Sequence, residues 1–334
     1  MKRILVTGGA GFIGSHFIRH MLHKHDDVYI INLDKLTYAG NLDNLKDVEN
    51  NSRYRFVQGD ICNKNIVEEL VKNVDVITNF AAESHVDRSI GKPDDFIKTD
   101  IFGVFILLEA ARKRGIERFV QISTDEVYGS IEKGLFNEND PLMPSSPYAA
   151  SKAGADRLAY SYYVTYGIPV VIPRSSNNFG AYQYPEKFIP LFITNALDNK
   201  ELPIYGDGKN IRDWLHVLDN CEAIEMVMER GKDGQVYNIG AGNERTNLEI
   251  TDFILQSLNK PKSLQTFIED RKGHDHRYAL NTNKIKGLGW NPCYSFETAI
   301  QETILWYQHN RWWWEKIKSG KYLEYYKQHY KRYP

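Results

Sequence analysis

The chain has 334 residues, enough to bury a large core in one large domain or two moderate ones. Its 42 lysines and arginines nearly balance its 43 aspartates and glutamates, which gives no basic field for nucleic acid. Cys62, Cys221 and Cys293 are too scattered for a disulfide framework or a metal cluster. The N-terminus leads straight into a strand pattern, and no apolar run approaches the roughly 20 residues of a membrane span. We therefore expect a cytoplasmic protein that binds no nucleic acid, no membrane and no metal.

A glycine-rich turn follows the first predicted strand and leads into a helix predicted over residues 15–25. Gly9, Gly11 and Gly14 match the pattern G-x-G-x-x-G, and Gly8 gives a second phasing with the same later glycines. Glycine at these positions lets the backbone turn tightly and approach a pyrophosphate, whose charge faces the N-terminus of the helix. The turn therefore predicts a dinucleotide site.

A carboxylate ends the second predicted strand. Asp34 lies 20 residues after Gly14, where dinucleotide-binding units place an acid on the adenosine ribose. Because a carboxylate repels a 2′-phosphate, Asp34 favours NAD over NADP, although the adjacent Lys35 leaves that preference open. Asp60, after the third predicted strand, either accepts a hydrogen bond from an adenine amino group or caps the next helix.

Strand and helix patterns alternate through the first half of the chain. The strand patterns occupy residues 3–7, 28–33, 54–57, 75–80, 119–122 and 169–174. A long helix is predicted over residues 93–114, with an apolar face through Ile97, Ile101, Val104, Leu107 and Leu108. The alternation predicts an α/β fold with a doubly wound parallel (Rossmann) sheet covered on both faces. We expect residues 1–175 to form an NAD-binding domain, to which residues 215–240 return, and residues 176–334 to form mainly a smaller substrate-binding domain.

Small and polar residues follow the fourth predicted strand. Ala81 and Ala82 leave room for a dinucleotide to pass close to the backbone. Ser84, His85 and Arg88 offer polar groups to a ligand beside it. Ligands of doubly wound sheets bind at the carboxyl ends of strands, so we expect this segment to border the same site as the glycine turn.

The fifth predicted strand leads into Thr124, Asp125 and Glu126, which places a hydroxyl and two carboxylates at the carboxyl end of a strand. Successive side chains of a strand point to opposite faces. Asp125 and Glu126 can therefore act on one substrate only if the chain leaves strand geometry at or just before Asp125. Two adjacent carboxyl groups can divide acid and base roles when their environments separate their pKa values.

Tyr148 and Lys152 lie four residues apart on a predicted helix and therefore share one of its faces. Ser146 can cap this helix and Pro147 fits its first position. A neighbouring ammonium group favours the phenolate form of a tyrosine. The pair is therefore a candidate catalytic base.

Beyond residue 174 the pattern changes to a polar loop over residues 177–187, which is long enough to suggest a functional role. Arg212 and Arg271 are candidates to hold a pyrophosphate, because guanidinium groups match phosphate oxygens. His274 and His276 lack the cysteine or acidic partners of a zinc site.

Aromatic residues crowd the C-terminal end of the chain, from Trp312 to Trp314 and at the tyrosines from Tyr322 to Tyr333. Among lysines, such rings could stack on nucleic acid. The near-zero net charge argues against that function. We predict that the aromatic side packs on the body of the protein or on a partner chain.

Seven segments together carry a family resemblance. Two are general, residues 8–14 and 148–152, and five are narrower, residues 34–42, 81–89, 123–129, 182–187 and 210–214. On these segments the chain resembles the extended short-chain dehydrogenase/reductase family of nucleotide-sugar enzymes, and within it the 4,6-dehydratases. The resemblance implies a Rossmann fold, a bound NAD, a homodimer and a role in deoxysugar formation. The implied reaction is dehydration of dTDP-glucose to dTDP-4-keto-6-deoxyglucose.

Other functions remain open beside this one. A related dehydratase could act on a UDP or GDP sugar, and an epimerase or decarboxylase could share the same frame. Thr124, Asp125 and Glu126 favour dehydration, because epimerases of the family eliminate no water. A non-catalytic NAD-binding protein would have no need of both acids.

The resemblance also implies a role for each catalytic residue. Tyr148 takes the C4 hydroxyl proton while hydride passes from C4 to NAD, and Lys152 lowers the tyrosine pKa and holds the nicotinamide ribose. Thr124 hydrogen-bonds the C4 oxygen. Glu126 removes the C5 proton and Asp125 protonates the leaving C6 hydroxyl. Hydride then returns to C6 while Glu126 reprotonates C5.

Two further sets of residues follow from the resemblance. The expected cofactor-binding residues are Gly8, Gly11, Phe12, Ile13, Gly14, Asp34, Lys35, Leu36, Thr37, Asp60, Ile61, Ala81, Ala82, Ser84, Thr99, Tyr148, Lys152 and Asn178. The expected substrate-binding residues are Ser84, His85, Arg88, Thr124, Asn177, Glu186, Lys187, Pro203, Ile204, Tyr205, Arg212, Asn247, Asp270, Arg271 and His274.

Overall fold

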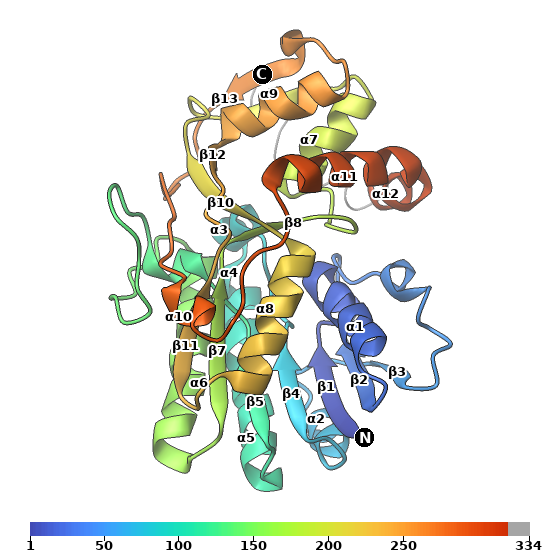
Figure 1. The fold of residues 1–334 in the computed structure, drawn as a ribbon, viewed down its shortest axis with the longest axis vertical. Helices are drawn as coiled ribbons and strands as arrows, with labels where there is room; N and C mark the ends of the chain where they lie inside the picture. Colours follow the sequence, from blue (N-terminus) through green and yellow to red (C-terminus); the bar gives the residue numbers. More distant parts are fainter. Residues whose placement is uncertain (320–334) are drawn as a thin grey trace.

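A parallel sheet of eight strands lies at the centre of residues 1–319, the part of the chain that this computed structural model describes (Figure 1). Its strands are β1 (Lys2–Thr7), β2 (Val28–Asp34), β3 (Tyr54–Gln58), β4 (Val76–Asn79), β5 (Arg118–Gln121), β6 (Ser123–Thr124), β7 (Val170–Ser175) and β11 (Gln235–Ile239). Their order is β11-β7-β5-β4-β1-β2-β3, with β6 beside β7. This confirms the predicted doubly wound sheet and the return of β11 to it. The order reverses between β1 and β4, where such sheets open a crevice for ligands.

Helices cover both faces of this sheet (Figure 1). One face carries α1 (Phe12–Lys24) and α8 (Val217–Arg230), and the other carries α2 (Lys64–Val71), α5 (Val104–Arg114) and α6 (Pro147–Tyr166). Burial on both faces explains why the strands read as unbroken apolar runs rather than alternating ones. Within residues 1–319, no helix combines the length and the apolar character needed to cross a membrane.

The long helix predicted over residues 93–114 is present, but it is not regular. α4 (Pro93–Phe96) continues through a π-helical segment, η2 (Ile97–Gly103), into α5. The wider π turn rotates the side chains relative to α-helical spacing. Ile97 of the predicted apolar face is 51% exposed, whereas Val104, Leu107 and Leu108 of the same face are buried.

Two small sheets lie beyond the carboxyl ends of the central strands (Figure 1). One is formed by β12 (Glu244–Thr246), β10 (Ile211–His216) and β8 (Asn177–Phe179), and the other by β13 (Gln265–Ile268) and β9 (Leu202–Tyr205). Around them are α7 (Phe188–Leu197), α9 (Asn247–Ser257), α11 (Phe296–His309) and α12 (Arg311–Ile317). The shorter helices are η1 (Leu42–Leu45), α3 (Val86–Gly91), η3 (Asp125–Tyr128), η4 (Lys262–Leu264) and α10 (Asn283–Lys286). The predicted division into domains at residue 175 stays a prediction.

Part of the aromatic C-terminal region packs on the body of the protein, as predicted. Trp313 and Trp314 are each only 1% exposed, whereas Trp312 remains exposed. The Trp313 indole N–H donates to Asn44 Oδ1 at 2.9 Å, which ties α12 to η1 far away in the sequence. The tyrosines from Tyr322 to Tyr333 lie outside the described residues.

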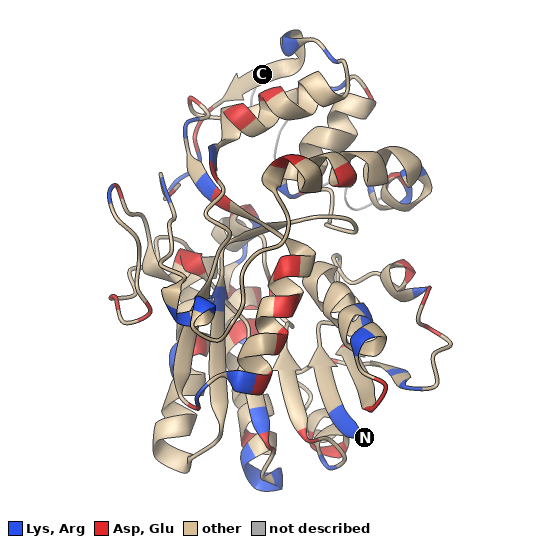
Figure 2. Ribbon diagram, in the orientation of Figure 1, with Lys and Arg blue, Asp and Glu red and all other residues tan. Residues whose placement is uncertain are grey.

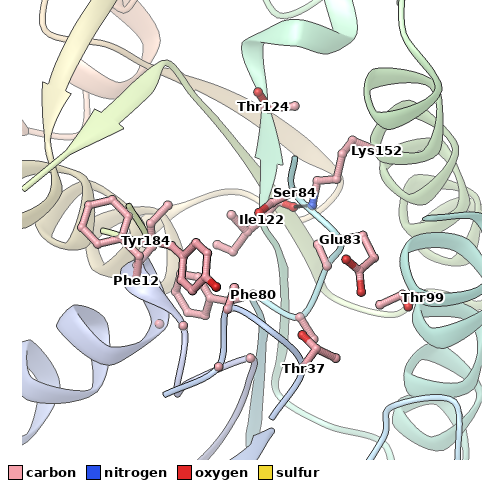
Figure 3. Close-up of a pocket in the computed structure, with 18 of the residues that line it drawn as sticks. Phe12, Thr37, Phe80, Glu83, Ser84, Thr99, Ile122, Thr124, Lys152 and Tyr184 are labelled. Carbon is pink, nitrogen blue, oxygen red and sulfur yellow. Dashed lines mark hydrogen bonds between the residues drawn. The ribbon is translucent and has the colours of Figure 1, made fainter. Parts of the chain in front are cut away.

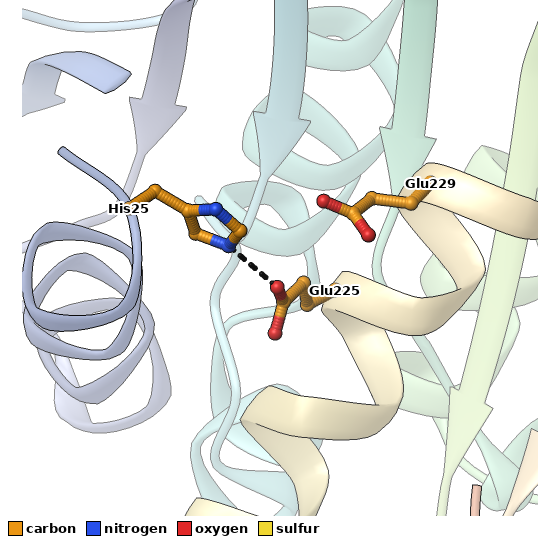
Figure 4. A group of neighbouring side chains, drawn as sticks. All are labelled: His25, Glu225 and Glu229. Atoms are coloured by element: carbon orange, nitrogen blue, oxygen red, sulfur yellow. Dashed lines mark hydrogen bonds and ion pairs between the residues drawn. The ribbon is translucent and has the colours of Figure 1, made fainter. Parts of the chain in front are cut away.

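Acidic residues recur along α8 (Figure 2), and one of them, Glu225, pairs with Lys24 of α1. Its carboxylate is paired with His20, Lys24 and His25 at 2.5, 2.7 and 2.6 Å, and Figure 4 shows the bond from His25. A Glu229 carboxylate oxygen lies within 4.8 Å of the ligand atoms of His25 and Glu225. Burial raises the pKa of Glu225, but these hydrogen bonds outweigh it and lower the pKa to about 2. The cluster therefore joins α1 to α8 as an ionic lock.

Candidate active site

A cavity of about 310 Å³ occupies the crevice at the reversal of the sheet (Figure 3). All the predicted cofactor-binding residues border it except Leu36, and all five predicted catalytic residues border it as well. Segments from β1, β2, β4 and β6 thus meet at one site although they are spread over the first half of the chain. Parallel strands bring their carboxyl ends to the same edge, which explains the convergence.

The glycine turn leaves no room for side chains. A Cβ on Gly8 would lie 2.6 Å from the Ala81 nitrogen, and the backbone there has a φ of +69°. A Cβ on Gly14 would lie 2.5 Å from the Gly8 oxygen. The turn therefore packs directly against the segment after β4, and its backbone faces the cavity at the start of α1. This geometry suits the close approach of a pyrophosphate.

Asp34 is the last residue of β2 and borders the cavity. Its two oxygens accept hydrogen bonds from the Ala10 and Leu36 amides at 2.9 and 2.8 Å. These bonds hold the carboxylate in place, and burial raises its pKa. Leu36 itself has a φ of +56° and does not border the cavity, so its predicted cofactor contact stays a prediction. Its amide orients Asp34.

Lys35 and Asp60 form an ion pair at 2.8 Å beside the same cavity. Lys35 follows Asp34 and had left the preference for NAD over NADP open. In the structure its ammonium group is engaged by Asp60. Asn63, not Asp60, caps α2 by accepting from the Asn65 and Ile66 amides. The capping alternative for Asp60 is therefore wrong, and its place at the cavity wall favours the contact with the ligand.

Several buried polar atoms of residues that border the cavity have no hydrogen-bond partner among the described residues. Asn178 Oδ1 and Ser176 Oγ are two of them. Buried polar groups are nearly always satisfied, so orphaned atoms on a cavity wall indicate a polar ligand. Together with the glycine turn and Asp34, they fit a dinucleotide that spans the cavity.

The chain leaves strand geometry between Thr124 and Asp125, as the two-carboxylate hypothesis required. β6 ends at Thr124, and Asp125 begins the 3₁₀ helix η3. The Thr124 hydroxyl donates to Asp125 Oδ1 at 3.1 Å and accepts from the Glu126 amide at 3.3 Å. This cap makes the turn, and both carboxyl groups consequently border the cavity.

The environments of these two carboxyl groups differ. Burial raises the pKa of Asp125 well above its usual range, and the neighbouring Glu126 charge adds to the effect. Burial also raises the pKa of Glu126, but Arg271, Arg212 and Lys187 act against it. Asp125 is thus favoured as the neutral acid and Glu126 as the ionised base, and Asp125 Oδ2 has no partner among the described residues.

Tyr148 and Lys152 enter the cavity from the first turns of α6. Ser146 caps the helix by accepting from the Ala149 amide at 3.1 Å, and Pro147 occupies its first position, as predicted. The Lys152 ammonium donates to the Ile122 carbonyl at 2.7 Å and points into the cavity in Figure 3.

The pKa of Tyr148 is raised, in contrast to the lowering that we predicted from Lys152. Burial raises it well above the usual range, and the charges of Glu126, Asp100 and Asp125 add to the effect. A hydrogen bond with Thr124 acts in the opposite direction. Burial also lowers the pKa of Lys152 itself. Sequence spacing showed the neighbouring lysine but not the acids that converge from other elements.

A second cavity, of about 170 Å³, adjoins the first. Glu126, Asn177 and Lys187 border both, so the two cavities meet at the catalytic turn. Arg212 and Arg271 border the second cavity together, although 59 residues separate them in the chain. A cationic hollow beside the carboxyl pair suits an anionic ligand.

The two arginines are held differently. Arg212 donates to the carbonyls of Asp275 and His276, and its guanidinium lies 4.3 Å from the centre of the Tyr278 ring. Arg271 lies 3.8 Å from an oxygen of Asp87, and its buried Nε has no hydrogen-bond partner among the described residues. Arg271 therefore keeps more of its donors for a ligand.

Three predicted substrate-binding residues border neither cavity. Arg88 bonds Glu186 at 2.8 and 3.0 Å and lies 3.9 Å from the centre of the Tyr38 ring. Ile204 is buried in the core of the C-terminal part. Asp270 accepts from His274 Nδ1 at 2.6 Å. Their predicted direct contacts stay predictions, although Arg88 and Asp270 each bond a residue that does border the second cavity, Glu186 and His274. The remaining predicted substrate-binding residues border one or both cavities.

With this geometry in hand, comparison with known proteins is decisive. A family model described as GDP-mannose 4,6 dehydratase matches residues 5–303. A curated relative from Streptomyces niveus, named dTDP-glucose 4,6-dehydratase, is 50% identical over 322 residues, which cover 95% of this chain and 96% of the relative. The chain belongs to the nucleotide-sugar 4,6-dehydratase family.

Solved structures of the dehydratase family agree with this assignment. A dTDP-glucose 4,6-dehydratase from Streptomyces venezuelae, crystallised with NAD, has a TM-score of 0.93 and 50% identity, covering 95% of this chain and 100% of its own. A UDP-glucose 4-epimerase from Thermotoga maritima has a TM-score of 0.86 at 29% identity, with 92% of this chain and 99% of its own covered. The fold is thus shared with epimerases, and the dehydratases are the nearer in sequence.

Some residues of the dehydratase site escaped the sequence reasoning. Asp87 and Tyr278 border the second cavity, and Glu83 borders the first. Asp100 lies behind the catalytic helix and bonds Ser151 at 2.6 Å. Asp87 and Glu83 lie in the segment after β4, where we already expected ligand contacts, so their carboxyl groups could have been predicted to face the ligand. Asp100 and Tyr278 gave none, because tertiary folding alone brings them to the site.

Proposed function

We propose that this protein catalyses the NAD-dependent dehydration of dTDP-glucose to dTDP-4-keto-6-deoxyglucose. The observation that carries the proposal is the pair Asp125 and Glu126, which faces the same cavity as Tyr148 and Lys152. Hydride transfer needs only Tyr148 and Lys152, whereas elimination of water needs an acid and a base in addition. The name of the Streptomyces niveus relative supports dTDP-glucose as the substrate.

The first step is oxidation at C4 of the hexose. Tyr148 accepts the C4 hydroxyl proton, and Thr124, which hydrogen-bonds the phenol, holds the C4 oxygen. Bound NAD supplies the hydride acceptor, returns that hydride to C6 at the end of the cycle, and carries a ring charge that favours the phenolate. Lys152 holds the ribose beside this ring. The burial that raises the Tyr148 pKa also excludes water from the reacting atoms.

The second step is elimination across C5 and C6. The C4 ketone makes the C5 proton acidic, and the ionised Glu126 removes it. Asp125, favoured as the neutral acid, gives its proton to the C6 hydroxyl, which leaves as water. When hydride arrives at C6, Glu126 returns its proton to C5 and Tyr148 keeps the C4 ketone in place. Atoms balance, with one water released from each sugar, once the proton that Tyr148 took from the C4 hydroxyl replaces the proton that Asp125 gave to the leaving water.

The second cavity would hold the nucleoside diphosphate. Arg271 and Arg212 supply guanidinium donors for the pyrophosphate, and Asn247 and Tyr205 border the same space. Since Glu126 and Lys187 border both cavities, a nucleotide bound there would direct its hexose to the catalytic turn. Binding energy from the nucleotide would thus position the reacting carbons.

A panel of nucleotide-hexoses tests the function. The protein is incubated with dTDP-glucose, UDP-glucose and GDP-mannose, and the product is read by the alkali-induced absorbance of a 4-keto-6-deoxy sugar. We expect the strongest signal with dTDP-glucose and none from the double variant Asp125→Asn/Glu126→Gln. A sugar inverted at C4 without keto product would instead indicate an epimerase, and no product from any hexose would contradict dehydration.

We also propose a homodimer. Ile97, Phe102 and Phe105 of η2 and α5 are 51%, 47% and 38% exposed, and Val164 of α6 is 62% exposed. Clusters of exposed large apolar residues on neighbouring helices mark association surfaces. Light scattering after gel filtration should give twice the monomer mass, and Phe105→Glu should shift it toward the monomer. Leu305→Glu, at an exposed position on α11, is the matched control.

The cytoplasm is the compartment that we propose for this enzyme. Cys62, Cys221 and Cys293 are all free thiols, and Cys221 is buried. Unpaired cysteines suit a reducing compartment. Fractionation of the native host should recover the enzyme with cytoplasmic markers, and recovery with extracellular protein would contradict the proposal.

A further inference from the structure

Asp100 lies directly behind the catalytic residues without bordering either cavity. It belongs to the π-helical segment η2, one residue after Thr99, and it is only 1% exposed. Figure 3 shows Thr99, Glu83 and Lys152 on the same side of the first cavity. Single π turns inside α-helices are frequent at functional sites. The mechanism described above gives no role to this buried acid.

The hydrogen bonds around Asp100 do not fit an ionised carboxylate. Ser151 Oγ lies 2.6 Å from Asp100 Oδ2 and 2.8 Å from the Tyr148 carbonyl oxygen. A hydroxyl has one hydrogen, and both of these neighbours would be acceptors if Asp100 were ionised. Both contacts are satisfied at once only when Asp100 carries a proton on Oδ2. The acid then donates to Ser151, and Ser151 donates to Tyr148.

The other carboxyl oxygen also has a defined partner. Asp100 Oδ1 accepts from the Glu83 amide at 2.8 Å. One neutral carboxylic acid therefore links the cavity wall after β4 to the first turn of α6, where the catalytic tyrosine stands. The side chain is fully used in this form, with one donor and one acceptor.

The charges around Asp100 agree with this hydrogen-bond count. Burial raises the pKa of Asp100 to about 7. Lys152 on α6 and the hydrogen bonds with Ser151 and the Glu83 amide act against this rise, and the Glu83 carboxylate adds to it. The Asp100 charge in turn raises the pKa of the Tyr148 phenol. The protonation state of one residue therefore bears on both members of the catalytic pair.

We infer that Asp100 acts as a neutral carboxylic acid that positions Tyr148 through Ser151, and that its ionisation disables the site. Once ionised, the carboxylate competes with the Tyr148 carbonyl for the single Ser151 hydrogen. Its charge also disfavours the phenolate that C4 oxidation needs. Asp100 is a positioning residue, and the inference rests on the proposed function only in taking Tyr148 as the base.

Asp100→Asn is the decisive variant, because the amide reproduces the neutral acid. Its oxygen can accept from the Glu83 amide and its NH₂ can donate to Ser151. Below the pKa of about 7 we expect C4 oxidation at a rate like that of the unaltered enzyme. As the pH rises through that value, the unaltered enzyme should lose up to about tenfold per unit. The variant should keep its rate, because it has no proton to lose.

Controls separate positioning from mere folding. Asp100→Ala should lower the rate at every pH, with rescue by the asparagine variant. Ser151→Ala removes the hydroxyl group that links Asp100 to Tyr148. Above the pKa of Asp100, where Asp100→Asn alone should keep a rate that the unaltered enzyme loses, adding Asp100→Asn to Ser151→Ala should change the rate less. Asp94→Asn, at an exposed position of the same helix, should leave the pH profile unaltered. An identical alkaline limb in Asp100→Asn and the unaltered enzyme would overturn the inference.

Two readouts do not depend on turnover. Infrared difference spectra between the unaltered protein and Asp100→Asn should show the carbonyl band of a protonated carboxylic acid near neutral pH. Folding raises the pKa of Asp100 from 3.8 to about 7. The stability that neutral Asp100 gives to the unaltered protein, compared with the variant, is therefore fully present below pH 3.8 and is lost as the pH rises through about 7. Melting temperatures should follow that trend. Absence of both signals would overturn the inference even if dehydration is established, and their presence would uphold it even if no tested sugar reacts.

Discussion

Asp125 and Glu126 are consecutive residues whose side chains border the same cavity. In a strand they would point to opposite faces. Strand β6 ends at Thr124, and the Thr124 hydroxyl caps the following 3₁₀ turn. The Thr124 cap thus ends the strand and lets both carboxyl groups border one cavity. Burial is the largest effect on the pKa of both carboxyl groups, but at Glu126 it is opposed by Arg271, Arg212 and Lys187, whereas at Asp125 the Glu126 charge adds to it. Asp125 is therefore the more strongly favoured of the two to be neutral.

Glu126→Gln should separate oxidation from elimination. The amide cannot remove the C5 proton, whereas Tyr148 remains able to accept the C4 hydroxyl proton. We expect product formation to fall by roughly 10²–10⁴-fold, the usual worth of a general base. Rapid-mixing absorbance should show reduced nicotinamide accumulating on the enzyme. Glu132→Gln, at an exposed position, is the control. Unchanged turnover in Glu126→Gln would refute its role.

Tyr148→Phe should block the first step instead. Phenylalanine keeps the ring that packs in an edge-on contact with Phe96 but has no hydroxyl to accept a proton. The rate of C4 oxidation should fall by roughly 10²–10⁴-fold while substrate binding changes little. Single-turnover absorbance and equilibrium binding measure the two effects separately. Tyr160→Phe, half-exposed on the same helix, should be nearly silent, and equal losses in both variants would argue against Tyr148.

Arg174→Met should destabilise the protein by roughly 3 kcal/mol. Arg174 of β7 bonds both oxygens of Asp156 on α6 at 2.8 and 3.1 Å, and both side chains are almost fully buried. Removing the arginine leaves a buried charge without its main partner. Urea unfolding measures the loss. The double variant Arg174→Met/Asp156→Leu should recover much of it, and no recovery would show that the loss comes from packing.

Glu225→Gln should weaken the contact between α1 and α8 in a pH-dependent way. Folding lowers the pKa of Glu225 from 4.5 to about 2. The stability that its charged form gives to the folded protein is therefore complete above pH 4.5 and is lost as the pH falls through about 2. We expect a loss of roughly 2 kcal/mol near neutral pH, shrinking toward zero in acid. Thermal unfolding across this range tests it, with the exposed Glu222→Gln as control. A constant difference at all pH values would contradict the ionic lock.

Local signals predicted much of this site. The glycine turn, Asp34 after β2 and the Tyr148–Lys152 spacing each depend on residues close together in the chain. Their meeting at one edge follows from parallel strands. The π turn that begins at Ile97, the bond from the Leu36 amide to Asp34 and the bond from Arg88 to Glu186 were missed. Each depends on a distant partner or on backbone detail that periodicity does not contain.

The sequence by itself determined the alternation of strands and helices, the glycine turn and the candidate reacting groups. These are properties of residue type and spacing, which act over one or two turns of chain. Tertiary structure alone decided the protonation preferences. Asp125, Glu126 and Tyr148 acquire theirs from burial and from charges such as Arg271, far away in the sequence. Electrostatic energy depends on distance in space and on exclusion of water, and the linear chain records neither.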